Sequence, residues 1–282
     1  MENPVKKHLY EALQSLDPRY SDAGYLSRTI KHMMKIMDEG RKIRHSLLSP
    51  VSRELVESAE DVIGEKLNRL VAVPEPPAVA FKVLETAEKL GISDLKLCYL
   101  PEINLLDLKK NHPIFQKRPI SLGIHDTVFD LMERRKMSSI IRSGWRLFTP
   151  TPQYDNPELS DEGISISGSG KGLRPSRIMK YIVPTMNERL GFSKETPFLS
   201  LPSIAEIILM DILSPELLEE NKKFRHSVYL SEWCLDKAFK GYGYTFVPCK
   251  VLNGFHEYFV EFPLTGAYRS GYRLIGNFAN LE

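Results

Sequence analysis

The sequence predicts an α+β protein with a helical N-terminal region, a mixed middle and an antiparallel β meander at the C-terminal end. Three observations support this prediction. Apolar residues recur at helical spacing through the first ninety residues. Residues 149–176 show little helical periodicity and predict a long irregular loop. The last forty residues are rich in aromatic and β-branched side chains, which favour strands. We therefore divide the chain into a helical region, 1–91, and an α+β region, 92–282.

Helix-start signals place the elements of the helical region. Asn3 and Pro4 predict the start of a first helix. A second helix is expected over residues 25–44, and Ser49 followed by Pro50 predicts the start of a third. The second helix has an apolar side, expected in the core, and a basic side, a candidate contact face or simply a solvated one. The apolar residues are Leu26, Ile30, Met33 and Met37, and the basic residues are Arg28, Lys31, Lys35 and Lys42.

A proline-rich connector, residues 73–77, leads to a short helix that runs to Leu90 and to a buried strand over residues 95–100. A longer helix is expected over residues 125–146. Ser203 and Glu206 have the spacing of a capping box, so a helix begins there.

Ser214 followed by Pro215 predicts another short helix, and residues 228–239 predict one more. Asn253 and Gly254 separate two of the strands of the expected meander.

Composition limits the class of protein. The chain has 282 residues, 42% of them hydrophobic, and no apolar run long enough to span a bilayer. The N-terminal sequence lacks the apolar core and cleavage site of a secretory signal. The three cysteines, Cys98, Cys234 and Cys249, lack metal-ligand spacing and do not indicate a disulfide framework. These features predict a cytoplasmic protein without a bound metal or other cofactor.

Charge is distributed in blocks although the net charge is only +2. Residues 109–148 carry nine Lys or Arg and three Asp or Glu, whereas residues 149–163 carry four acidic residues and no basic one. Residues 164–192 are basic again, with five basic residues and one acidic, and residues 193–220 are acidic, with six acidic and one basic. Such blocks predict opposed charged patches, or solvated faces that neutralise one another.

The glycine-rich segment ISISGSGKGLRPSRIMKYI, residues 164–182, is a candidate phosphate-binding element. It is not a P-loop, because Ser169 stands where that motif needs lysine, and Leu173 breaks the dinucleotide-binding pattern. A glycine-rich turn that enters a helix at Pro175 would still present backbone N–H groups to an anion. Four basic residues accompany it: Lys171, Arg174, Arg177 and Lys180.

We expect Ile178, Tyr181 and Ile182 to pack inward, and Pro184 to end or kink the helix. The alternative to a phosphate grip is a flexible connector that leads into an ordinary surface helix.

A second basic cluster is expected to form the adjoining surface. It comprises Arg134, Arg135, Arg142 and Arg146, with Trp145 among them. Basic residues beside an aromatic ring can hold phosphate and stack a nucleobase. The alternatives are that Trp145 belongs to the core and that the cations complement the end of a helix dipole. Tyr268, Arg269, Tyr272 and Arg273 form a weaker aromatic and basic pattern on a predicted strand or turn.

These patterns favour a non-catalytic nucleic-acid-binding protein, with DNA and RNA both open as ligands. The main alternative is an adaptor or structural subunit of a larger assembly, whose arginines bind a protein partner with an acidic face. A third interpretation is enzymatic. In residue order, His112, the pair His125–Asp126 and either Asp130 or Asp211 resemble the metal-dependent phosphohydrolases of the HD type. That resemblance covers four residues, and it implies a metal-binding site that hydrolyses phosphate esters.

Overall fold

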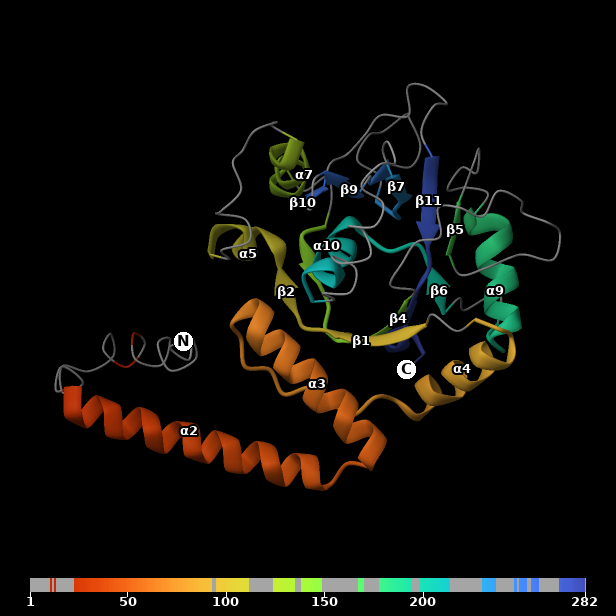
Figure 1. Cartoon of the computed structure of the whole chain (residues 1–282). Helices are drawn as coiled ribbons and strands as arrows, with labels where there is room; N and C mark the ends of the chain where they lie inside the picture. Colours follow the sequence, from red (N-terminus) through yellow and green to blue (C-terminus); the bar gives the residue numbers. More distant parts are fainter. Residues whose placement is uncertain are drawn as a thin grey trace. The chain divides into compact units, whose positions relative to one another are not determined.

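A computed structural model describes the chain as two compact units, Met1–Pro76 and Pro77–Glu282 (Figure 1). The residues that it describes are 11, 13, 23–92, 95–111, 124–134, 138–148, 167–169, 178–193, 198–213, 230–236, 246–247, 249–252, 255–258 and 269–281. The predicted helix at Ser214 lies outside these residues, and so does the predicted first helix apart from residues 11 and 13, which are helical. The domain boundary after residue 91 stays a prediction, and each compact unit is treated by itself below.

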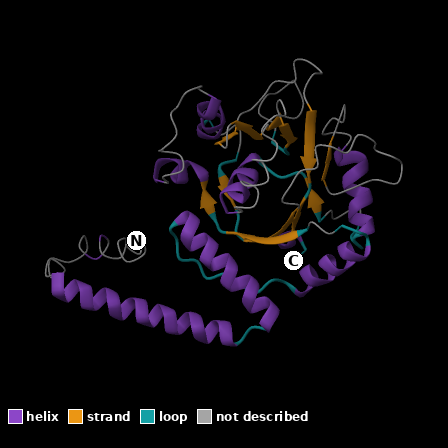
Figure 2. Cartoon of the chain, in the orientation of Figure 1, coloured by secondary structure: helices purple, strands orange, loops and turns teal. Residues whose placement is uncertain are grey.

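The first unit is built from helices α2 (Ala23–Ser46) and α3 (Pro50–Leu67), as the sequence predicted (Figure 2). The start of α3 follows from its capping residues. The Ser49 hydroxyl accepts a hydrogen bond from the backbone N–H of Ser52 at 3.2 Å, and Pro50 supplies a fixed φ where no N–H is needed. The helix ends at Asn68, whose φ of 55° is left-handed, a conformation that asparagine tolerates better than most residues.

A buried ionic network joins the two helices. The carboxylate of Glu60 on α3 accepts from Arg41 Nε at 2.9 Å, from Arg44 Nη2 and from the backbone N–H of Val73 at 3.0 Å. Its other partner is His45, whose Nε2 lies 3.0 Å away, and the Nδ1 of the same ring lies 3.0 Å from Glu57. The Glu60 side chain is only 5% exposed, so these partners take the place of water around its carboxylate.

Fewer residues of the apolar side of α2 are buried than the sequence predicted. Leu26 and Ile30 are fully buried, whereas Met33 is half-buried and Met37 is exposed. Helical periodicity predicts which residues share a side, but burial depends on how far the packed neighbours extend along the helix. Farther along, this side is occupied by polar groups of the ionic network, Arg41 and Arg44.

The second unit combines helices with short strands. Its helical segments are α4 (Ala78–Lys89), α5 (Leu105–Asn111), α7 (Ile124–Glu133), the π-helical turn η2 (Ile178–Ile182), α9 (Val183–Arg189), α10 (Ile204–Leu213) and the 3-10 turn η3 (Phe278–Asn280). Its strands are β1 (Lys96–Leu100), β2 (Ile103–Asn104), β3 (Ile140–Ile141), β4 (Gly144–Phe148), β5 (Ser167–Ser169), β6 (Leu199–Ser200), β7 (Leu230–Trp233), β8 (Phe246–Val247), β9 (Cys249–Leu252), β10 (Phe255–Tyr258), β11 (Arg269–Arg273) and β12 (Ile275–Asn277). The α+β class is therefore confirmed.

Four strands of this unit form an antiparallel sheet of order β1-β4-β12-β6. Tyr99 on β1 pairs with Trp145 on β4, and their rings meet edge to face at 5.5 Å. Helix α10 contacts β1 and carries a nearly continuous run of buried apolar residues. A helix that is apolar on all sides belongs in a core. The predicted strand at residues 95–100 and the predicted start of α10 are thus confirmed.

The C-terminal strands do not form one clear meander. Strands β9 and β10 make a hairpin whose register leaves two residues, 253 and 254, between the paired Leu252 and Phe255. The predicted turn at Asn253 and Gly254 itself lies outside the described residues. Strand β11, however, pairs in parallel with β7 and antiparallel with β5, and β12 joins the separate sheet of β4 and β6. Pairing with strands distant in sequence replaces the expected neighbour-to-neighbour order.

One predicted helix is correct only in its first part, and another is wrong where the structure describes it. Within residues 125–146, helix α7 ends at Glu133 and the described residues that follow form β3 and β4. Gly144, with a φ of 148°, opens β4 in a conformation that a helix does not allow. Within residues 228–239, residues 230–233 form β7, which pairs with β8 and β11. In both cases the partner strands override a local helical pattern.

No described helix has both the length and the apolar character needed to cross a membrane.

Candidate nucleic-acid interface

The described part of the glycine-rich segment is anchored at both ends. Ser167–Ser169 forms β5, the edge strand of the sheet β5-β11-β7-β8. Gly168 pairs with Tyr272, so residues 167–169 of the glycine-rich segment lie against strand β11. The segment resumes at η2, which continues into α9. Lys171, Arg174 and Arg177 lie between these elements, outside the described residues. Part of the predicted loop 149–176 is therefore a strand, and the rest is not described.

Lys180 and Tyr181 form an exposed pair on η2. The Lys180 ammonium lies 5.2 Å from the centroid of the Tyr181 ring, within the range of a cation–π contact. Tyr181 is 58% exposed, whereas Ile178 and Ile182 are buried and fix this turn against the unit. The inward orientation predicted for Tyr181 is thus wrong, and that predicted for the two isoleucines is confirmed.

The backbone explains why Tyr181 points outward. A π-helical turn has i→i+5 hydrogen bonds and more residues per turn than an α-helix, so it shifts the side on which each later residue falls. Pro184 lacks an N–H and stands in the first turn of α9, directly after η2. The helix therefore continues through Pro184, which was expected to end or kink it. The proline was the sequence signal that could have located this irregular turn and the exposed tyrosine.

The second basic cluster divides into exposed and buried members. Arg134 is exposed and its Nη2 lies 3.9 Å from the Asp130 carboxylate, a distance typical of a weak surface pair. Arg142 is exposed on the residues that join β3 to β4. Arg135 lies outside the described residues. Arg134, Arg142 and Lys180 are the predicted contacts that the structure places on the surface of the second unit.

Arg146 and Trp145 are buried. This corrects the surface position expected for Arg146, and for Trp145 it agrees with the core alternative that the sequence left open. Arg146 is 2% exposed, and its Nε donates to the Glu206 carboxylate at 3.2 Å. Its guanidinium also donates to the backbone carbonyls of Trp145 and Arg142, at 3.3 and 3.1 Å. A guanidinium has five donors in a fixed plane, which suits it to join a strand to a helix. Arg146 therefore connects β4 to α10.

The C-terminal aromatic and basic pattern is also internal where the structure describes it. Tyr272 and Arg273 are fully buried on β11. Tyr268 lies outside the described residues, as does the side chain of Arg269. The described members are thus part of the core, and we leave them out of the interface.

The start of α10 carries a cluster of polar groups that sequence reasoning only partly anticipated. Ser203 and Glu206 form the predicted capping box: the Glu206 carboxylate accepts from the Ser203 N–H at 3.0 Å, and the Ser203 hydroxyl accepts from the Glu206 N–H at 3.2 Å. Asp236, far along the chain, adds a second cap by accepting from the Ile204 N–H at 2.7 Å. No local pattern in the sequence marks Asp236 for this role.

Burial governs the titration of this cluster. It raises the pKa of Asp236, and the nearby Glu206 carboxylate adds to the increase, although the hydrogen bond from the Ile204 N–H opposes it. Burial also raises the pKa of the Cys234 thiol well above its usual range, and the adjacent Asp236 adds to it. Cys234 is fully buried and uncharged, which agrees with a structural rather than a reactive cysteine.

Asp236→Asn is expected to remove a pH-dependent loss of stability. The pKa of Asp236 is raised in the folded state, so its protonated form contributes stability below about pH 4 that disappears as the pH rises through the raised value. Asparagine keeps an oxygen for the Ile204 N–H and does not ionise. Between pH 4 and pH 7, the unfolding free energy of the natural protein should therefore decrease with pH relative to that of the variant. Parallel pH profiles for the two proteins would contradict this assignment.

Comparison with protein-family models, with curated proteins and with solved structures gives no match.

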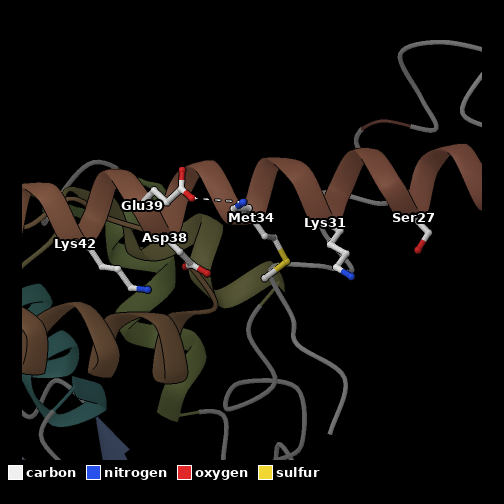
Figure 3. A pocket seen from close by; sticks show the side chains of 7 residues that line it. Ser27, Lys31, Met34, Asp38, Glu39 and Lys42 are labelled. Carbon is white, nitrogen blue, oxygen red and sulfur yellow. Dashed lines mark ion pairs between the residues drawn. The ribbon is translucent and has the colours of Figure 1, made fainter.

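The alternative sites give less support. His112 lies outside the described residues, and so do the side chains of His125, Asp126 and Asp211, so the HD-type interpretation stays a prediction. Among the described residues, no group of three or more His, Cys, Asp or Glu side chains could hold a metal ion. A shallow pocket of about 630 Å³ lies along α2 in the first unit (Figure 3). Lysines and carboxylates of α2 both line it, so it favours neither an anion nor a cation.

Proposed function

We propose that the second unit binds nucleic acid through the basic segment 171–177 and the exposed pair Lys180–Tyr181 that follows it. The pair carries the proposal, because a cation and an exposed aromatic ring stand side by side on a helical turn held by buried neighbours. Lys171, Arg174 and Arg177 precede this turn directly in the sequence. This part of the chain therefore combines several positive charges with an accessible aromatic ring.

Each component matches a part of a nucleic-acid strand. Lysine and arginine bind the phosphate backbone without regard to sequence. An exposed tyrosine can stack on a nucleobase, which requires an unpaired base. The pair therefore favours single-stranded over duplex ligands, and it does not discriminate DNA from RNA. Arg134 and Arg142 are exposed cations of the same unit and would add further phosphate contacts.

Two variants test the two components separately. Replacing Arg174 and Arg177 together with alanine should weaken binding and reduce the salt slope by roughly 1.4, because about 0.7 counterions are released per phosphate of a single strand. Tyr181→Ala should weaken binding about fivefold or more through lost stacking, with little change in salt slope. Tyr181→Phe keeps the ring and should bind like the natural protein.

Lys82→Ala provides the matched control, since Lys82 is an exposed lysine on α4 in the same unit. Affinities are measured by fluorescence anisotropy with labelled single strands. If the arginine pair and Tyr181→Ala behave like Lys82→Ala, the interface is not at this position. If the natural protein binds no nucleic acid at all, the adaptor interpretation takes its place, and the same arginines become candidates for an acidic protein partner.

A further inference from the structure

The π-helical turn η2 lies between two buried anchors of the second unit. Ile178 at its start is fully buried, and α9 behind it has a buried side. That side comprises Val183, Met186 and Asn187. Lys180 stands between the two anchors and is exposed. The geometry of the turn therefore decides where this cation points.

The side chain of Asn187 fixes α9 against strand β6. It is fully buried, and its Oδ1 accepts from the Leu199 N–H at 2.8 Å. Its Nδ2 donates to the Val183 carbonyl at 2.9 Å, so the amide is bonded to the strand at one end and to its own helix at the other. Rotation of α9 about its axis would break a buried hydrogen bond and leave a buried polar group unsatisfied, which is costly.

A regular α-helix would not satisfy both anchors. Continued backwards from α9 at about 100° per residue, it would place Ile178 roughly 130° from the middle of the buried side, toward solvent. It would place Lys180 roughly 70° from that middle, at the edge of the buried side. In the structure Ile178 is buried and Lys180 is exposed. A π-helical turn has more residues per turn and a smaller angle per residue, which rotates Ile178 inward and Lys180 outward.

Pro184 and Thr185 support the wider turn. In an α-helix the N–H of residue 184 would bond the carbonyl of residue 180, and proline has no N–H to donate. The Thr185 hydroxyl donates to the Tyr181 carbonyl at 2.8 Å, so a side chain supplies a hydrogen bond within the turn. Both residues thus favour the irregular backbone over a regular helix.

We propose that η2 is a positioning element of the interface, in which the π-helical turn between Ile178 and the Asn187 anchor directs Lys180 outward to contact a phosphate. Asn187 is then a positioning residue, which acts through Lys180 without touching the ligand. The role in phosphate contact rests on the proposed function. The orientation of Lys180 is a property of the protein alone and is measured without a ligand.

Deletion of Met179 combined with Pro184→Ala tests the orientation of Lys180. The deletion removes one residue from the turn and moves Ile178 to a position that faces inward on a regular helix, while the alanine restores the missing N–H. We expect a continuous α-helix with Lys180 at the edge of its buried side. Acetic anhydride should then acetylate Lys180 several-fold more slowly than in the natural protein, as measured by mass spectrometry. Lys82, exposed on α4, is the internal reference.

Pro184→Ala alone is the matched control. It keeps both anchors and the number of residues between them, so the wider turn and the fast acetylation of Lys180 should persist. Circular dichroism shows whether the shortened variant keeps its helices. If it does not fold, NMR couplings through hydrogen bonds in the natural protein decide the matter. The Val183 N–H should couple to the Ile178 carbonyl, and a coupling to the Met179 carbonyl would show a regular helix and overturn the proposal.

Binding to labelled single strands tests the contribution of the turn to the interface. In the natural background, Lys180→Ala should weaken binding and reduce the salt slope by roughly 0.7, the value for one phosphate contact on a single strand. In the shortened variant the same substitution should change the salt slope little, because Lys180 no longer points outward. A loss of stability alone would not remove the effect of one particular lysine.

Two further results would overturn the proposal. One is acetylation of Lys180 that is as fast in the shortened variant as in Pro184→Ala. The other is an effect of Lys180→Ala on the salt slope that is equally large in the natural and shortened backgrounds. A natural protein that binds no nucleic acid would instead contradict the proposed function, and the acetylation rates would still decide the orientation of Lys180.

Discussion

Glu60→Ala is expected to destabilise the first unit by roughly 3 kcal/mol or more. Removing one member of a buried ionic network leaves its partners uncompensated, which typically costs 3–5 kcal/mol. Here the loss would leave Arg41, Arg44 and His45 without their shared carboxylate and the Val73 N–H without its acceptor. The two arginines are partly exposed and water would solvate them in part, so we expect the lower end of that range.

Amide hydrogen exchange followed by mass spectrometry measures this effect in the first unit alone. Protection of α2 and α3 should fall sharply in Glu60→Ala. Glu65→Ala is the matched control on the same helix. Glu65 is exposed, and the ion pair described for it is with Lys66. Its effect should be below about 0.5 kcal/mol. Equal protection in the two variants would show that the network contributes little.

Gly276→Ala is expected to destabilise the second unit by about 3 kcal/mol. A Cβ on Gly276 would lie 2.2 and 2.4 Å from two ring atoms of Phe198, far inside normal contact distance. Phe198 has little room to withdraw, since its ring stacks on Phe192 at 4.4 Å and contacts Phe278 at 4.7 Å. Gly276 also pairs with both β4 and β6 in the middle of its sheet. Overpacking typically costs about 1–3 kcal/mol and occasionally more, and the close contact with Phe198 places this variant at the upper end, about 3 kcal/mol.

Thermal unfolding compares this variant with Gly64→Ala. Gly64 lies within α3, where an added Cβ would meet only Arg69 O at 3.8 Å, an ordinary contact. Alanine there should be neutral or stabilise by up to about 1 kcal/mol. The double variant Gly276→Ala with Phe198→Leu, which shortens the obstructing side chain, should recover part of the lost stability. An unchanged unfolding midpoint for Gly276→Ala would contradict the close packing described here.

The correctly predicted elements are those determined by neighbours in sequence. Ser49 with Pro50, and Ser203 with Glu206, carry complete helix-start signals within a single turn, and both helices begin where expected. The segments wrongly predicted as helix, within residues 140–146 and 230–233, depend on strand partners far away in the chain. Their local patterns were compatible with a helix, and only the assembled sheets decide between the alternatives.

For the candidate site, too, local features could be predicted from the sequence and features that depend on distant residues could not. The sequence alone located the basic residues, but exposure depends on distant partners. Arg146 is buried because Glu206, sixty residues later, accepts its hydrogen bond. Tyr181 is exposed because a π-helical turn precedes Pro184. Counting charges along the sequence therefore predicts a basic region, whereas the identity of the accessible side chains follows from the structure.

Binding of the full chain to labelled single- and double-stranded DNA and RNA, titrated from about 50 to about 300 mM salt, tests the central proposal most directly. We expect submicromolar binding to single strands at low salt, weaker binding to duplexes, and affinity that falls steeply as salt increases. Weak binding at every salt concentration, or affinity that does not depend on salt, would contradict nucleic-acid recognition by the basic segment and the Lys180–Tyr181 pair.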